Sequence, residues 1–458
     1  MRRASFIFGA GLAWLASVSG LSVSSATAED GGIWEREKLT GDWGGVRTAL
    51  KDKGIDFTFN YIGETLSVRS GGIKRGTTFE GRFDGMVDLD LEKLSGWTGG
   101  HIQVRAFQIH RANGENAATL AGSLADPSNI DALPTTRLFT AWFQQDFGKS
   151  GSVRAGLLAA DDEFATSTTA GGLINGTFGW PVLMAANLPS GGPAYPLASP
   201  GIRLQINPTE NTSLLAAVFG GDPAGRDCTR DPQECNRYGT TFSLSARPLF
   251  MAEAQYQANQ EKDATGLAAA YKIGFWYHAD EFADQRFGLD GFGNTQLLAS
   301  DPTLAPFVHH GNWGVYGVID QMLWRSKTAS TSVFLRGGLT PDERNMVSWY
   351  VDGGIGFKGL IPGRGDDTLT LGAGYSRISP QASAFDRDTL LINGPPYPVR
   401  DYELVLEASY IWQIAPWWSI QPDIQYIMHA GGNVPHPDNP AATLGNILIV
   451  GARTSITF

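Results

Sequence analysis

The chain is poor in several features that soluble globular proteins use. Only 18% of its 458 residues are charged, and beyond the first 28 residues no segment offers the eighteen or more apolar residues of a spanning helix. Any membrane crossing must therefore be made by strands. The 35 basic residues are outnumbered by 46 acidic ones and form no basic block, which excludes a nucleic-acid binder.

Catalytic and metal-binding motifs are also missing. No histidine lies in a Gly-x-Ser-x-Gly or His-Glu-x-x-His context, and the adjacent His309 and His310 would need further ligands to hold a metal. Gly354-Ile355-Gly356 lies in a strand pattern with no helix after it, so it does not predict a nucleotide loop. We therefore predict neither an enzyme nor a metal or cofactor site.

Cysteine is scarce too, with only Cys228 and Cys235 in the chain. Their spacing does not fit a Cys-x₂₋₄-Cys metal site, and no second pair exists. In an exported protein this short polar segment predicts a local disulfide, which would add about 2–3 kcal/mol by closing a small loop. Its expected role is to shape a loop.

Glycine, in contrast, is abundant. The 57 glycines are nearly twice the average usage of about 7%, and 11% of the residues are aromatic. Glycine suits strongly curved strands and tight turns, so the composition favours an all-β protein.

The first 28 residues resemble a secretory signal peptide. Met1-Arg2-Arg3 is basic, Phe6 to Ala16 is apolar, and Ala26-Thr27-Ala28 supplies small residues before a cut at Glu29. Arg2-Arg3 also raises a twin-arginine signal, although Phe6 lies one place late for that pattern. We expect 1–28 to be removed and 29–458 to form one domain.

The last twelve residues predict a strand with one apolar and one polar face. Leu448, Val450, Ala452, Thr454, Ile456 and Phe458 share a face, and Gly451, Arg453, Ser455 and Thr457 share the other. An edge strand of a soluble sandwich would alternate in the same way. The closing strand of a transmembrane barrel also fits, because its outer face meets lipid. The terminal Phe458 resembles the signal that the outer-membrane assembly machinery reads.

Similar alternation recurs along the mature chain, at 83–92, 101–106, 153–159, 202–206, 267–278, 403–410 and 420–426. Periodicity alone does not distinguish a sandwich from a barrel with its polar face inside. The signal peptide, Phe458 and aromatics that resemble a membrane girdle (Trp412, Trp417, Trp418 and Tyr426) favour the barrel.

Length indicates the size of this barrel. About 430 mature residues, at roughly 24–28 per strand and connection, predict about 16 to 18 antiparallel strands, and barrels of that size leave an aqueous channel. One short helix is predicted in the N-terminal periplasmic segment 29–55. It would begin at a cap on Asp42, include Val46 and Leu50, and end at Gly54.

Four motifs in order resemble the carbohydrate-selective porin (OprB) family. They are Leu39-Thr40-Gly41-Asp42-Trp43-Gly44-Gly45-Val46-Arg47; Gly221-Asp222-Pro223 with Asp231-Pro232-Gln233; Asp342-Glu343-Arg344-Asn345 with Gly353-Gly354-Ile355; and the stretch 403–432 around Ala415-Pro416-Trp417-Trp418. Ala430 occupies a position where the family often has proline. The resemblance implies a monomeric barrel of about 16 strands, in the outer membrane of a Gram-negative bacterium and among its lipids, that passes small saccharides such as glucose.

A sugar channel needs hydrogen-bonding groups that replace water at a constriction, and an aromatic face for the apolar side of the ring. Arginine offers five donors in a fixed fork. The candidate constriction residues on the predicted inner faces are Arg82, Asp84, Arg105, Arg154 and Arg203. Other predicted inward charges are Asp88, Asp90, Glu253, Arg336, Glu407 and Arg453. Any one of these side chains could instead simply line water.

A long segment from Phe164 to Pro200 is rich in Gly, Ala and Pro and poor in charge. Loops this long inside a compact protein are usually functional. We expect it to fold into the barrel and narrow the pore, with Trp180 as a stacking face for a sugar. The alternative is an apolar lid on the surface.

Overall fold

The computed structural model describes residues 32–112, 114–261 and 264–458. The predicted signal peptide lies outside this part of the chain. In the described part, no helix is long and apolar enough to cross a membrane.

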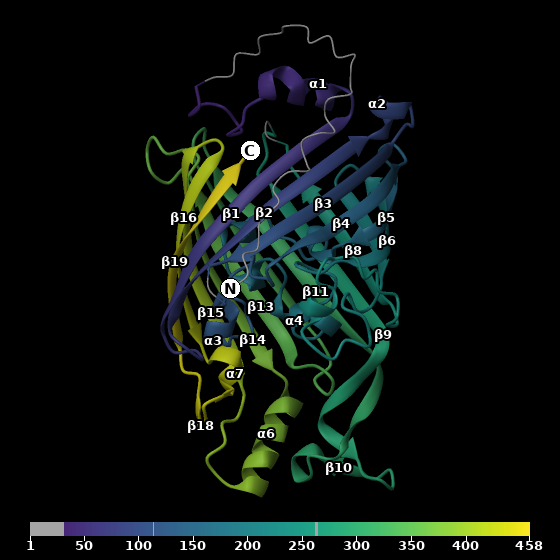
Figure 1. The fold of residues 1–458 in the computed structure, drawn as a ribbon, viewed down its shortest axis with the longest axis vertical. Coiled ribbons are helices and arrows are strands. Elements are labelled where there is room, and N and C mark those ends of the chain that lie inside the picture. Colours follow the sequence, from purple (N-terminus) through teal and green to yellow (C-terminus); the bar gives the residue numbers. More distant parts are fainter. Residues whose placement is uncertain (1–31, 113, 262–263) are drawn as a thin grey trace, which may run out of the picture.

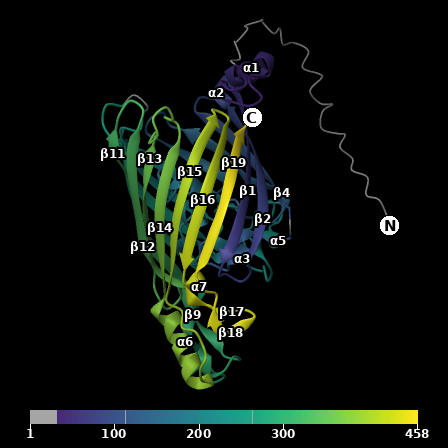
Figure 2. The same cartoon turned by 90° about the vertical axis from the view of Figure 1, so that its left-hand side faces the viewer.

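The described residues form a closed antiparallel β-barrel (Figures 1 and 2). Of the seventeen strands in its sheet, all except the short β10 (Thr295–Leu297) make up the wall, which confirms the predicted fold class of about 16 strands. The barrel closes where the last wall strand pairs with the first, so that Glu64 lies opposite Arg453. Closure therefore gives each wall strand a hydrogen-bonded neighbour on both sides.

The wall strands are β1 (Ile55–Ser70), β2 (Gly76–Asp90), β3 (Gly100–Arg111), β4 (Thr135–Asp146), β5 (Gly151–Leu158), β6 (Ser199–Thr209), β7 (Thr212–Phe219), β8 (Leu249–Ala258), β9 (Ala269–Leu289), β11 (Ala305–Arg325), β12 (Ser330–Leu339), β13 (Val347–Lys358), β14 (Thr368–Ile378), β15 (Tyr402–Ala415), β16 (Trp418–Met428) and β19 (Ile447–Thr457). A separate hairpin pairs β17 (Pro435–His436) with β18 (Asn439–Thr443).

Helices are short and lie in the connections. They are α1 (Val46–Asp52), α2 (Leu91–Ser95), α3 (Ala117–Ala121), α4 (Val182–Ala185), α5 (Pro232–Cys235), α6 (Pro380–Asn393) and α7 (Ala430–Asn433). The 3₁₀ turns are η1 (Trp43–Gly45), η2 (Ala160–Asp162), η3 (Ala170–Gly172), η4 (Gly176–Phe178), η5 (Pro189–Gly191) and η6 (Leu298–Ser300). The predicted strand 83–92 ends two residues early, because the Asp90 side chain caps α2.

The two ends of the barrel differ. At one, the short-turn end, connections such as 147–150, 210–211 and 416–417 are brief. The other, the long-loop end, carries the connections that hold α3, α4, α6 and α7 (Figure 1). α1 and the C-terminus both lie at the short-turn end.

The predicted N-terminal helix is present as α1, with one difference at its start. Gly45 is the residue that precedes α1, and Asp42 instead accepts hydrogen bonds from the backbone and the hydroxyl of Thr48, both at 2.9 Å. Gly54 follows the helix with φ of 92°, a conformation that glycine adopts at no steric cost. Arg47 of α1 donates to a C-terminal oxygen of Phe458 at 2.9 Å, which links the two ends of the chain.

Alternation along the strands follows the arrangement with apolar residues outside. On β2, Phe83 is 36% exposed on the outer face and the next residue, Asp84, is 5% exposed inside. On β9, Ile273 is 70% exposed on the outer face, whereas Lys272 faces inward and bonds Thr166 in the lumen. This arrangement confirms the membrane barrel over the soluble sandwich.

Aromatic side chains form a band at each end of the barrel. Phe57, Phe59, Phe83 and Phe458 form a chain of ring contacts at the short-turn end, and Trp349, Tyr375, Tyr402 and His429 stack at the long-loop end. Such bands mark membrane interfaces. Trp417, predicted as a girdle residue, is only 8% exposed, because it packs on Trp34 and donates to Ile33.

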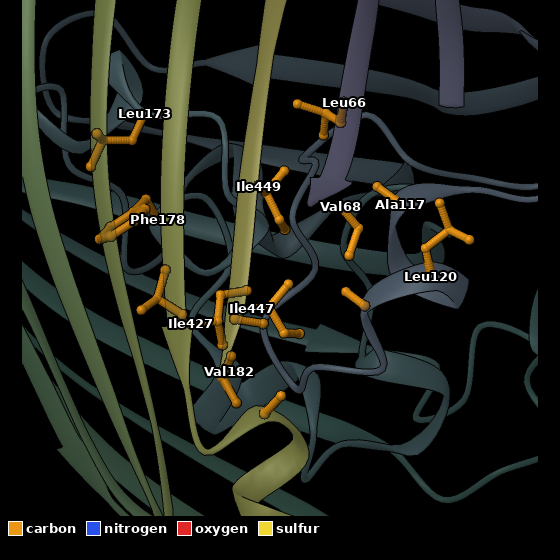
Figure 3. Packing of buried hydrophobic residues seen from close by; sticks show 14 of the residues in the cluster. Leu66, Val68, Ala117, Leu120, Leu173, Phe178, Val182, Ile427, Ile447 and Ile449 are labelled. Atoms are coloured by element: carbon orange, nitrogen blue, oxygen red, sulfur yellow. The ribbon is translucent and has the colours of Figure 1, made fainter. Parts of the chain in front are cut away.

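Part of the inner face is apolar, which the polar-inside pattern does not predict. Leu66 and Val68 of β1, Ile427 of β16, and Ile447 and Ile449 of β19 are at most 2% exposed. Figure 3 shows these strand side chains directed at α3 and at loop residues inside the barrel. Burial there stabilises the inserted loops by about 1.5–3 kcal/mol for each large side chain. The lumen is therefore partly filled by the protein's own loops.

Candidate functional site

The 159–198 connection between β5 and β6, here called the inward loop, crosses the lumen to the far wall. The Ala165 amide donates to Glu253 of β8 at 2.8 Å, and the Thr169 amide and hydroxyl donate to Asp320 of β11 at 2.8 and 2.6 Å. Asn175 donates to Glu407 of β15 at 3.0 Å. The segment predicted to fold into the barrel therefore does so, which excludes a surface lid.

Arg336 of β12 makes the densest set of contacts with the inward loop. Its guanidinium pairs with Asp352 of β13, and it donates to the carbonyls of Ala165, Thr177 and Gly179 at 3.1, 3.0 and 3.2 Å. The side chains of Arg336 and Asp352 are 2% and 0% exposed. This predicted inward arginine therefore holds the loop and is closed off from the pore.

A second inward loop (114–134, between β3 and β4) packs beside the first. Its Leu124 and Ala125 amides donate to Glu403 of β15, each at 2.8 Å. Asn129 accepts from Arg453 at 2.6 Å, and its amide donates to Ile174 of the inward loop at 2.8 Å. Glu403 and Arg453 thus anchor the second loop, and the two loops support each other.

The four candidate arginines lie on the inner wall between β2 and β6 and are here called the arginine row. Arg82 lies on β2, Arg105 on β3, Arg154 on β5 and Arg203 on β6. Arg154 and Arg203 are direct cross-strand partners. Like charges placed opposite each other destabilise a sheet unless they are neutralised.

Carboxylates of the wall and of the inward loop supply this neutralisation. The Arg105 Nε lies 3.0 Å from Asp84, and its Nη1 lies 3.7 Å from Asp162. Glu163 lies between the facing pair, 3.5 Å from Arg154 and 2.9 Å from Arg203. The start of the inward loop is therefore bound to the arginine row by ion pairs.

Neutral and aromatic side chains hold the row in place. The Gln144 amide oxygen accepts from Arg154 at 2.8 Å and from Arg203 at 3.1 Å. The guanidinium of Arg154 lies 4.0 Å from the Trp142 ring centre. Arg82 lies in the same way over Phe107 and Tyr195, at 4.8 and 4.9 Å. Cation–π contacts of this kind restrict the arginines to a few orientations.

The candidates differ in exposure to the lumen. The side chains of Arg105 and Arg154 are 25% and 18% exposed, and that of Asp162 is 36% exposed. Arg203 is only 2% exposed, so its guanidinium braces Glu163 and Gln144. Trp180 is half-buried, and its indole N–H donates to the Gly191 carbonyl at 2.9 Å.

Three consecutive acids at the start of the inward loop, Asp161, Asp162 and Glu163, were missed by the sequence reasoning. Their signal was a run of three carboxylates just before a segment almost free of charge. Asp161 lies outside the wall strands and accepts from the Tyr195 amide at 2.9 Å. Burial, reinforced by the Asp162 charge, raises the pKa of Asp161 to about 7.

The predicted disulfide joins Cys228 to Cys235 in the β7–β8 connection, where Cys228 precedes α5 and Cys235 is its last residue. This connection contacts both inward loops: Gln233 accepts from Leu133 at 2.7 Å, and Arg137 bridges the carbonyls of Gln233 and Pro196 at 3.2 and 3.1 Å. The predicted bridge is therefore present, and the loop that holds it supports the inward loops.

Comparison with known proteins agrees with this architecture. The family model described as "Carbohydrate-selective porin, OprB family" matches residues 74–458. Porin B of Pseudomonas aeruginosa is 25% identical over 456 residues, covering 92% of this chain and 91% of that protein. The putative porin QuiX of Acinetobacter baylyi is 23% identical, covering 91% of this chain and 94% of that protein.

Among solved structures, the high-pH structure of Pseudomonas putida OprB has the same fold, with a TM-score of 0.80 at 21% identity. The alignment covers 93% of this chain and 99% of that one. The low-pH structure of the same protein aligns over equal shares with a TM-score of 0.54.

Proposed function

This chain belongs to the carbohydrate-selective porin (OprB) family, and from that membership we propose that it lets glucose and similar small saccharides diffuse through its pore. The protein is a passive channel of the Gram-negative outer membrane and not an enzyme. We further propose which residues contact the solute, how the barrel is oriented in the membrane, and that the protein is monomeric.

The orientation follows from the two ends of the barrel. Outer-membrane barrels have short periplasmic turns and longer extracellular loops. We therefore place the short-turn end, with α1 and the C-terminus, in the periplasm, and the long-loop end outside the cell. A solute entering from outside then meets the two inward loops before the periplasm.

The observation that carries the proposal is the pair of partly exposed guanidinium groups opposite the inward loop. Arg105 and Arg154 are held by Asp84, Gln144 and Trp142, so their remaining N–H groups need little reorganisation to meet a hydroxyl. Each hydrogen bond to a sugar is worth about 0.5–1.5 kcal/mol after the loss of its water. Such weak bonds allow binding and fast release, as conduction requires.

The roles within the site then divide. Arg105 and Arg154 contact the sugar. Asp84 fixes Arg105 by an ion pair, and Arg203 fixes the Glu163 and Gln144 side chains that contact Arg154. Arg82, stacked between Phe107 and Tyr195, extends the donor row. Trp180, whose N–H is already bonded within the inward loop, offers its ring face as a stacking surface.

Planar-bilayer recordings with the purified mature protein test this proposal. Added glucose or a disaccharide should reduce the ion current through open channels. Arg105→Ala or Arg154→Ala should weaken the apparent affinity of this block by roughly tenfold at most, because each removes one weak hydrogen bond of at most about 1.5 kcal/mol. Unblocked conductance should change less, since the barrel wall remains.

The control is Arg69→Ala, an exposed arginine on the outer face of β1. Arg453 would be a poor control, because it is 7% exposed and anchors the second inward loop. Equal block in all three variants would place the sugar elsewhere in the pore. Channels that no sugar blocks would identify a general porin, and absence of channels would refute the function altogether.

A further inference from the structure

We propose that Asp162 and Glu163 are specificity-determining residues that make the constriction accept uncharged saccharides and reject anionic ones, such as sugar acids and sugar phosphates. This inference rests on the proposed sugar pathway. It concerns the charge of the solute, which the family match does not address. The two carboxylates that would reject anions belong to the inward loop, and the arginines that they face belong to the wall.

Opposite charges pair where the arginine row meets the inward loop. Arg105, Arg154 and Arg203 meet Asp84, Asp162 and Glu163, and every one of these six groups lies within 4 Å of an opposite charge. A row of bare guanidinium groups would be an anion site, because arginine binds carboxylates and phosphates as a fork. For Arg105, Arg154 and Arg203 that role is already taken by the protein's own carboxylates.

Only some of these charged side chains are exposed to the lumen. Asp84 and Arg203 are 7% and 2% exposed, so a passing solute does not meet them directly. The groups it meets include Asp162, 36% exposed, and Glu163, 20% exposed, beside Arg105 and Arg154. An anion would have to displace a carboxylate that is tethered to the loop.

The same ion pairs do not reject a neutral sugar. A paired guanidinium keeps N–H groups that do not point at its carboxylate, and each carboxylate oxygen accepts more than one hydrogen bond. Sugar hydroxyls both donate and accept, so they can use both kinds of group without separating the ion pairs. The same pairs that repel an anion therefore offer a neutral sugar donors and acceptors side by side.

The loop geometry makes this arrangement specific to the constriction. Strand β5 ends at Leu158, and the turn η2 (Ala160–Asp162) follows directly. The Glu163 amide donates to the Ala160 carbonyl at 3.1 Å, and the Phe164 amide donates to the same oxygen at 2.8 Å. This tight turn returns the acids toward β5 and β6, where Glu163 lies between Arg154 and Arg203.

The test measures ion selectivity and solute selectivity separately. Reversal potentials across a KCl gradient give the chloride-to-potassium permeability ratio for wild-type channels and for Asp162→Asn, Glu163→Gln and the double variant. Liposome swelling gives the rates for glucose and for gluconate, which has nearly the same size. The matched controls are Asp366→Asn and Glu210→Gln, whose side chains are 83% and 87% exposed, away from the row.

We expect each constriction variant to raise the chloride-to-potassium ratio by roughly tenfold, because in water one charge about 6 Å from the path changes the permeability of each ion about threefold, in opposite directions. The gluconate-to-glucose ratio should rise in the same direction, and the controls should match wild type. Because Glu163 also braces Arg203, Glu163→Gln could disturb folding. The more exposed Asp162, with its single 3.7 Å pair, keeps the inference testable.

Unchanged ratios in a folded Asp162→Asn channel would overturn the inference, as would a wild-type channel that passes gluconate as fast as glucose. These outcomes differ from failure of the sugar pathway itself. In that case wild-type channels would show no block by glucose, whatever their ion selectivity.

Discussion

Replacing Arg336 with methionine should release the inward loop from the far wall. The side chain of Arg336 is 2% exposed and makes one buried ion pair with Asp352 and three hydrogen bonds to loop carbonyls. Methionine retains much of the volume but none of the donors. The Asp352 charge and three carbonyls would then be left inside the barrel without their partner.

The magnitude follows from the cost of breaking a buried pair, which is about 3–5 kcal/mol. Since the wall is closed by its own ladder of hydrogen bonds, this cost falls on the inserted loop and much less on the barrel. It corresponds to a shift of about 10²–10⁴ in the equilibrium between inserted and released loop. Single-channel conductance should rise and become noisy, and block by glucose should weaken.

Two further variants separate loop release from general damage. Arg336→Lys keeps the charge but loses the planar fork, so we expect an intermediate effect. In Arg336→Met/Asp352→Leu both charges are removed, so the penalty of an unpaired buried charge disappears. That variant should recover part of the block. A folded Arg336→Met channel with wild-type conductance and wild-type sugar block would refute the reasoning.

The remaining predictions concern assembly, the disulfide and pH. Phe458→Asp should lower outer-membrane levels, because it replaces the ring that contacts Phe83 with a charge on the closing strand; unchanged levels on fractionation would contradict this. A Cys228→Ser/Cys235→Ser protein should still fold, since the barrel closes without the bridge, and alkylation of the native protein should find no free thiol. Burial holds the pKa of Asp161 at about 7, so lowering the pH from 8 to 6 removes a negative charge beside the row and should raise relative chloride permeability. Asp161→Asn should abolish this change, and an identical pH dependence in that variant would show that another group titrates.

Much of the wall could be predicted from the sequence because its signals are local. Alternation along β2, β9 and β19 reports the two faces of each strand, whatever those strands pair with. The candidate arginines were predicted from the same alternation, and in the structure Arg154 and Arg203 lie directly opposite each other. The Cys228–Cys235 bridge also joins residues near each other in the chain.

Other features escaped prediction because they depend on distant partners. Arg336 and Arg453 were read as lumen charges, yet each is closed off by a loop that enters the barrel far from it in sequence. Trp417 alternates like a girdle residue, but the N-terminal segment covers it. Asp162 and Glu163 lie in the connection after β5. Alternation along a strand does not predict where side chains in a connection point.

The sequence by itself determined that the strands have one face for lipid and one for the lumen, because apolar and polar residues alternate along each strand. Only the tertiary structure decided which inward charges meet water and which anchor loops. Arg453 pairs with Glu64 across a separation of 389 residues, and Arg336 reaches Thr177 across 159. Such contacts exist only once the barrel closes and its loops fill the lumen, so the same arginine can be a pore residue or a loop anchor depending on what packs over it.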